Sequence, residues 1–108
     1  MRVYVACGVT DMRKGFDGLA PLVWTALALH LDGGAVFLFQ GKSYDHLKAL
    51  LWDDQGLVLY DKRLEGGRFV WPQTMTGTVT LTNAQLSMLL EGIDWRMPAW
   101  TARPEVAV

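Results

Sequence analysis

The chain has 108 residues, of which 51% are hydrophobic and 19% charged, and this balance excludes a disordered, highly charged tail. The formal net charge of −1 excludes a strongly basic nucleic-acid coat, although a local basic patch remains compatible with it. The single cysteine, Cys7, excludes an internal disulfide and any site built from several thiolates, and we expect a reducing, cytoplasmic setting. No apolar run reaches the ~20 residues that a membrane span requires.

The first part of the chain predicts a strand, a helix and a second strand. Residues 2–6 alternate between polar and apolar side chains, which is typical of a strand. From Asp17 onward, apolar residues fall at helical spacing until Asp32-Gly33-Gly34 ends the pattern. This helix is apolar almost all round, so we expect it to be buried on more than one side, in its own core or against a partner. Residues 35–40 form a Val- and Phe-rich run that predicts a central strand.

The middle of the chain predicts a hairpin. Residues 47–52 and 57–62 flank Asp53-Asp54-Gln55-Gly56, where an Asp at the first position and a Gly at a left-handed position suit a type I turn with a bulge. Gly66-Gly67 then predicts a second tight reversal, followed by a short strand over 69–71.

A last strand and a second helix are expected before the C-terminus. Residues 78–81 alternate between polar and apolar side chains. Thr82 and Gln85 have the spacing of a capping box at the start of a helix, and Gly92 is a suitable helix stop. Residues 95–108 have no periodicity, and we expect an extended tail that packs or binds.

Together these elements predict one α+β domain over residues 1–94, followed by the tail over 95–108. Short turns join antiparallel neighbours, so we expect an antiparallel meander of about five to six strands with two helices packed on one face.

Catalytic and metal-binding patterns are weak. His30 and His46 lie far apart, and neither has a carboxylate at ligand spacing, so we interpret both as ordinary histidines. The acids Asp11, Asp53, Asp54 and Glu65 suggest a metal-dependent nuclease that would use Asp11, Asp53 and Glu65. Helix capping accounts better for Asp11, and turn formation accounts better for Asp53 and Asp54. We therefore predict no catalytic residue, no metal site and no cofactor, and keep the small nuclease or hydrolase as an alternative.

Basic and aromatic residues recur together along the chain. Such residues can bind nucleic acid, because the cations hold phosphates and the aromatic rings stack on bases. They can also form a hot spot of a protein interface, or they can be side chains of a solvated strand edge. The sequence leaves these three interpretations open. Five tryptophans are many for a small core, and we expect Trp95 and Trp100, outside regular structure, to be exposed to a partner. The candidate binding residues are Arg13, Lys14, Lys62, Arg63, Arg68, Trp71, Trp95, Arg96 and Trp100.

Four blocks of the sequence, in order over nearly the whole chain, resemble one protein family. The blocks are residues 8–19, 51–65, 67–72 and 89–96. They are similar to the TnpB (Orf-two-like) accessory proteins of IS-sixty-six-type bacterial insertion sequences. The resemblance implies a companion of a larger DDE-type transposase in DNA transposition, with no known catalytic residue.

This chain departs from the family pattern by carrying fewer basic residues over 41–48 and 96–100, which weakens a role in DNA contact at those positions.

Our leading hypothesis is a non-catalytic accessory protein of DNA transposition that displays these cations and indoles to the transposase, to element-end DNA, or to both. A third possibility is a regulatory subunit that forms homo-oligomers through the apolar helix near Trp24.

Overall fold

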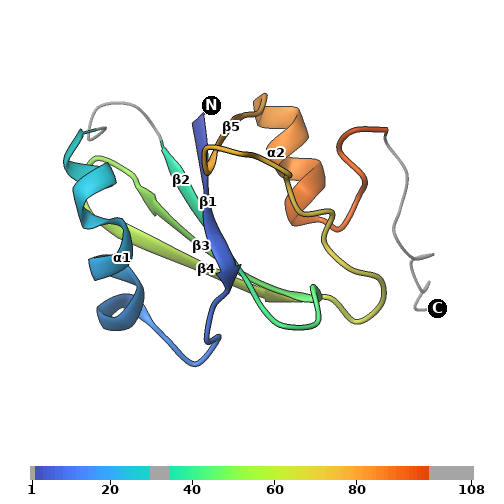
Figure 1. The fold of residues 1–108 in the computed structure, drawn as a ribbon, viewed down its shortest axis with the longest axis horizontal. Helices are drawn as coiled ribbons and strands as arrows, with labels where there is room; N and C mark the ends of the chain where they lie inside the picture. The colour runs from blue at the N-terminus through green and yellow to red at the C-terminus, as the bar shows by residue number, and fades with distance from the viewer. Residues whose placement is uncertain (1, 30–34, 98–108) are drawn as a thin grey trace.

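The structure is a computed structural model that describes residues 2–29 and 35–97, with the backbone alone for Cys7 and residues 24–29. The predictions for His30, for the helix stop at 32–34, for Trp100 and for the tail beyond residue 97 lie outside this range. The elements are β1 (Arg2–Val9), α1 (Phe16–Leu29), β2 (Val36–Gln40), β3 (His46–Trp52), β4 (Leu57–Arg63), β5 (Thr78–Thr80) and α2 (Asn83–Leu90) (Figure 1).

The strands form one five-stranded mixed sheet in the order β4-β3-β2-β1-β5. The predicted α+β class is confirmed, and three of the four strand pairs are antiparallel. The prediction of a pure meander was wrong for β1 and β2, which run parallel. The reason is α1, since a helix between two neighbouring strands carries the chain back to the end of the sheet from which it started.

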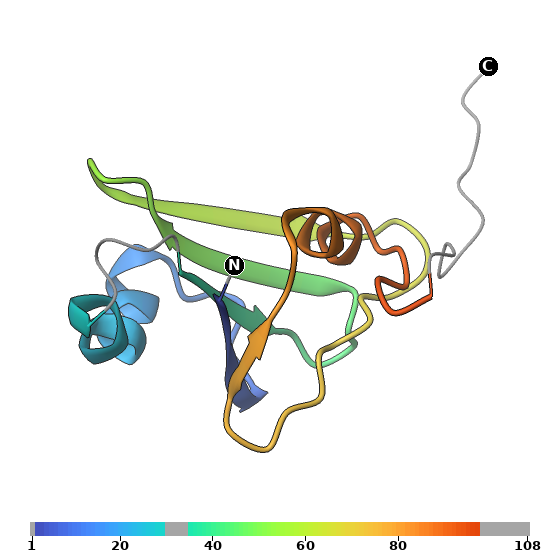
Figure 2. The same cartoon turned by 90° about the horizontal axis from the view of Figure 1, so that it is seen from above.

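The two helices pack on opposite faces of the sheet, whereas the sequence predicted both on one face (Figures 1 and 2). β2 explains the difference because all five of its residues are buried. Its side chains alternate, so Val36 and Leu38 belong to one core, and Phe37 and Phe39 to the other. A strand that is apolar on both faces needs a cover on each.

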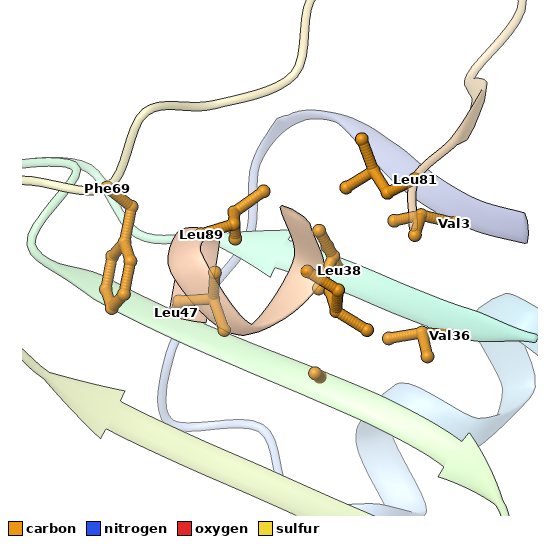
Figure 3. Packing of buried hydrophobic residues seen from close by; sticks show 9 residues of the cluster. Val3, Val36, Leu38, Leu47, Phe69, Leu81 and Leu89 are labelled. Atoms are coloured by element: carbon orange, nitrogen blue, oxygen red, sulfur yellow. The ribbon is translucent and has the colours of Figure 1, made fainter. Parts of the chain in front are cut away.

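The larger core lies between the sheet and α2 and includes residues from the loop before β5 (Figure 3). The smaller core lies between the sheet and α1. The first consists of Val3, Val36, Leu38, Leu47, Ala49, Phe69, Leu81, Leu86 and Leu89, and the second of Leu19, Val23, Ala35, Phe37, Phe39 and Leu50.

The segment between β4 and β5 is irregular, so the prediction of a strand over 69–71 was wrong. Isolated backbone hydrogen bonds, and not a continuous β-ladder, hold this segment in place. The N–H of Phe69 donates to the carbonyl of Tyr44 at 2.8 Å, and the N–H of Leu64 donates to the carbonyl of Asp45 at 2.8 Å. Phe69 is buried in the α2-side core, so packing holds this segment against the sheet without strand pairing.

The β3–β4 hairpin is confirmed, but its left-handed residue is Asp54 and not Gly56. Asp54 has a φ of 75°, while Asp53 accepts hydrogen bonds at 3.0 and 2.9 Å from the backbone N–H groups of Gln55 and Gly56. An aspartate tolerates this conformation when side-chain hydrogen bonds stabilise the turn.

Local signals at both ends of α2 are confirmed. Thr82 accepts a 3.0 Å hydrogen bond from the N–H of Gln85, whose side chain accepts one of 2.9 Å in return. At the other end Gly92 has a φ of 74°, and Ile93 donates its N–H to Met88 at 2.9 Å. This is the pairing of a Schellman motif, which terminates a helix where a glycine adopts the left-handed conformation.

The capping box makes Thr82→Ala a specific test of α2. The variant loses one hydrogen bond to an otherwise unpaired helix N–H, so its free energy of unfolding should fall by about 1 kcal/mol. Urea denaturation followed by circular dichroism measures the change. Thr82→Ser keeps the hydroxyl and should stay near the wild-type value; equal losses in the two variants would contradict a role for the cap.

Candidate functional site

The predicted binding residues do not share one surface, because β4 turns neighbouring side chains to opposite faces of the sheet. Lys62 pairs with Leu47, which belongs to the core under α2. The next residue, Arg63, pairs with His46 and therefore points to the face that α1 partly covers. The sheet thus separates two cations that are adjacent in the sequence.

The loop between β1 and α1 brings two more cations to the α1 face. The Nζ of Lys48, which points to this face of β3, donates a 2.7 Å hydrogen bond to the carbonyl of Lys14. Arg13 and Lys14 are both exposed in this loop. Arg13, Lys14 and Arg63 therefore lie on the α1 side of the sheet, and Lys62 lies on the other.

Two of the predicted arginines are already paired with carboxylates. Arg13 holds Asp11 through its Nε and a terminal nitrogen, at 3.0 and 2.8 Å. Arg96 holds Asp94 in the same way, with both distances 3.0 Å. The Arg13 side chain lowers the pKa of Asp11, and the Arg96 side chain lowers that of Asp94 to about 2. Each pair is close to neutral overall, so its attraction for phosphate is weaker than that of an arginine without a carboxylate beside it.

The predicted tryptophans contribute more to the fold than expected. Trp95 is half-buried against the α2-side core, and its indole N–H donates to the carbonyl of Val70 at 2.9 Å, so it is less exposed than expected; its contact with a partner stays a prediction. Trp71 packs against the same core and is also half-buried. Arg68 is exposed in the loop that precedes it, and Trp100 lies outside the described residues.

A polar cluster on the α1 face joins residues that the sequence analysis did not connect. His46 Nε2 lies 2.6 Å from a carboxylate oxygen of Asp61, and its Nδ1 lies 3.4 Å from a terminal nitrogen of Arg63. The other oxygen of Asp61 is 3.6 Å from the buried ammonium of Lys48. Both ring nitrogens of His46 therefore face partners, and the cluster ties β3 to β4 and, through Lys48, to the loop at Lys14.

The hairpin register could have revealed this cluster. The turn sets Trp52 opposite Leu57, and counting back along both strands places Lys48 opposite Asp61. Opposite charges directly across an antiparallel pair are a favourable arrangement.

An open groove remains on the α1 face because one helix is too narrow to cover it. A helix is about 10 Å across, and strands lie about 4.8 Å apart, so α1 covers roughly two of the five strands. Leu19 and Val23 of α1 pack with Phe37, Phe39 and Leu50 of β2 and β3. Near β1 and β5 this face is hollowed, and Tyr4, Ala6 and Thr78 belong to the lining of the hollow.

The groove has a volume of about 630 Å³ and a largely apolar lining. Tyr4 and Phe37 stack within it, with ring centroids 4.9 Å apart. Val9 and Leu22 also line it and are 56% and 57% exposed. Lys14 and Asp11 contribute polar groups to the same lining. Of the predicted binding residues that the structure describes, Lys14 is the one that takes part in this groove.

The proposed nuclease acids are not assembled. Among residues 2–29 and 35–97, no three or more His, Cys, Asp or Glu side chains gather closely enough to hold a metal ion. Asp11 binds Arg13, and Asp53 caps its own turn. The set of Asp11, Asp53 and Glu65 therefore provides no shared metal site.

Comparison with known proteins identifies the family. The sequence model of the IS66 Orf2 like protein family matches residues 1–100. The chain belongs to the IS66 Orf2-like family. It is 49% identical over 104 residues to uncharacterized protein y4hO of Sinorhizobium fredii (strain NBRC 101917 / NGR234), covering 96% of this chain and 90% of that relative. Uncharacterized protein y4jC of the same organism is 36% identical over 95 residues, covering 88% and 81%.

The family resemblance noted from the sequence is confirmed, and it gives this IS66 Orf2-like protein an accessory role associated with transposition. No solved structure matches the chain. Within the described residues, no helix has the length and apolar character needed to cross a membrane.

The Asp94–Arg96 pair allows a test of the local electrostatics. Arg96→Gln should raise the pKa of Asp94 from about 2 toward its ordinary value of 3.8, because the hydrogen bond from the Arg96 side chain is the main cause of the shift. Since the pKa of Asp94 is lowered in the folded state, the pair stabilises the fold above about pH 4, and this contribution is lost as the pH falls toward 2. Carboxyl NMR titration measures the pKa.

Arg13→Gln is the matched control, because it should move the pKa of Asp11 and leave that of Asp94 in place. An unchanged Asp94 titration in Arg96→Gln would show that this ion pair does not form in solution.

Proposed function

We propose that this IS66 Orf2-like protein is a non-catalytic accessory subunit that binds the DDE-type transposase of its element through the groove beside α1. The observation that carries the proposal is the exposure of Val9 and Leu22 in the lining of that groove. Exposed apolar side chains that cluster in a concavity favour a protein partner that covers them. The proposal places the protein in the cytoplasm with the element's DNA.

The electrostatics favour a protein partner over duplex DNA. Binding to a duplex neutralises several phosphates at once and needs a stripe of available cations. Here the net charge is −1, and Arg13 and Arg96 are each held by a neighbouring carboxylate. The remaining predicted cations are divided between the two faces of the sheet, as Lys62 and Arg63 illustrate. Among the described residues these cations therefore form no single stripe, which supports a protein partner over a duplex.

Lys14 gives the groove a specific polar contact. It is exposed and contributes to the lining, while its own carbonyl is fixed by the buried Lys48. A carboxylate on the transposase is the matching group. A charge at the rim of an interface mainly sets the rate of association and the choice of partner, while apolar burial supplies most of the affinity.

The double substitution Val9→Thr with Leu22→Gln tests the groove. It removes apolar surface that a partner would bury, and complete burial of one such side chain is worth about 1.5–3 kcal/mol. We expect the affinity for the cognate transposase to fall at least about tenfold. Isothermal titration calorimetry or surface plasmon resonance with purified transposase provides the measurement.

Met75→Gln is the matched control, since Met75 is fully exposed but lies outside the groove lining. It should bind as the wild type does. Equal affinities for the groove variant and the wild type would refute the groove as the contact. A concentration-dependent dimer that the same double substitution dissolves would assign the groove to a second copy of this chain instead.

A further inference from the structure

A second, more polar pocket of about 330 Å³ lies beyond the groove, on the other side of β1. We call it the Trp71 pocket. It is bordered by the ends of β1 and β2, by the β2–β3 turn and by the irregular segment before β5. Its lining includes Gly8, Gln40, Tyr44, Trp71, Thr74 and Gly77.

Trp71 gives the pocket one aromatic wall. The residue packs against the α2-side core, which fixes its position, and it is half-buried. In the described part of the chain its indole N–H has no hydrogen-bond partner, whereas the N–H of Trp95 is bound to Val70 at 2.9 Å. Trp71 thus combines a rigid position with a polar group left available.

Tyr44 contributes a second aromatic ring from a strained backbone position. Its φ is 63°, a left-handed conformation that an aromatic residue rarely adopts. Two hydrogen bonds hold it there: its N–H donates to Gly41 at 3.3 Å, and its carbonyl accepts the N–H of Phe69 at 2.8 Å. Strain of this kind persists where the surrounding structure enforces it, and it is concentrated at binding sites. Tyr44 remains 42% exposed.

Gln40 supplies a carboxamide with an unfilled hydrogen bond. Gln40 is 8% exposed, and its Nε2 makes a long bond of 3.4 Å to the carbonyl of Gly8. Its carbonyl oxygen is buried and has no partner in the described structure. Buried carbonyl oxygens are normally satisfied, so this amide favours a ligand that brings an N–H group to it.

We infer that the Trp71 pocket binds a single unpaired nucleobase of DNA. Aromatic rings stack on any base, and a glutamine amide hydrogen-bonds a base edge. In a duplex the faces of a base are stacked on its neighbours, so a base has to be unpaired and unstacked to present its face to Trp71. A base would stack on Trp71 or Tyr44 with its polar edge toward Gln40. The inference deepens the proposed accessory role, because it names unpaired element DNA as a second ligand.

The test uses the full chain and DNA alone. The probes are labelled single strands of oligodeoxyadenylate and oligodeoxythymidylate, and the duplex that they form together. Fluorescence anisotropy should show that at least one single strand binds more tightly than the duplex. Its salt dependence should be shallow, because stacking of one base releases few counterions. In a ¹H–¹⁵N NMR titration, the Trp71 indole resonance should shift.

Two substitutions and one control locate the site. Trp71→Leu removes the stacking surface and should weaken single-strand binding about tenfold or more. Gln40→Met has a similar volume, so it should weaken binding without lowering the thermal midpoint, which separates binding from folding. Trp52→Leu is the matched control, since Trp52 is also half-buried but packs against the α1-side core. It should bind single strands as the wild type does.

Three results would overturn the inference. One is equal or tighter binding of the duplex, and another is an equal loss of affinity in Trp52→Leu and Trp71→Leu. The third is weaker transposase binding by Trp71→Leu when neither single strand binds, which would assign the pocket to a protein side chain. The DNA assay contains no transposase, so the absence of single-strand binding would not contradict the groove proposal. Likewise, unchanged transposase binding by the groove variant would not contradict the inference about the Trp71 pocket.

Discussion

The side chains of β2 alternate between two cores, with Leu38 packed toward α2 and Phe37 and Phe39 packed toward α1. Every residue of this strand is buried, and the arrangement of the other elements follows from that constraint. β1 and β3 flank β2 and complete its hydrogen bonds, while one helix covers each of its faces. Because β1 and β2 are parallel, the chain has to cross the sheet between them, and α1 is that crossing.

The helices cover each face of the sheet only in part, and both proposed sites lie at the edges of the covered areas. α1 leaves the sheet open near β1, which exposes Leu22 in the groove. On the other side of β1, the irregular segment before β5 closes over the sheet only in part, which leaves the Trp71 pocket. Val5, Ala6 and Gly77 line both concavities. The two proposed sites therefore adjoin along β1.

The sequence identified cationic and aromatic side chains as candidate binding residues, but it did not show which of them lie together in the fold. Arg13 and Arg96 were recognised as cations, yet each is held by a carboxylate two residues earlier in the chain. Trp71 was recognised as an aromatic contact residue, but nothing in the sequence brings Gln40 or Tyr44 beside it. The hydrogen bond from the N–H of Phe69 to the carbonyl of Tyr44 holds the segment that carries Trp71 against the β2–β3 turn, and Gln40 directly precedes that turn.

The sequence by itself determined the features that depend on neighbours along the chain: the β3–β4 hairpin, the Thr82 capping box and the Gly92 helix stop. Each is stabilised by hydrogen bonds or turn conformations within a few residues, so the local pattern is sufficient. Only the tertiary structure decided the parallel pairing of β1 with β2, the placement of the helices on opposite faces and the assembly of the groove and the pocket. These depend on which distant apolar surfaces bury one another, and a local pattern is compatible with several such packings.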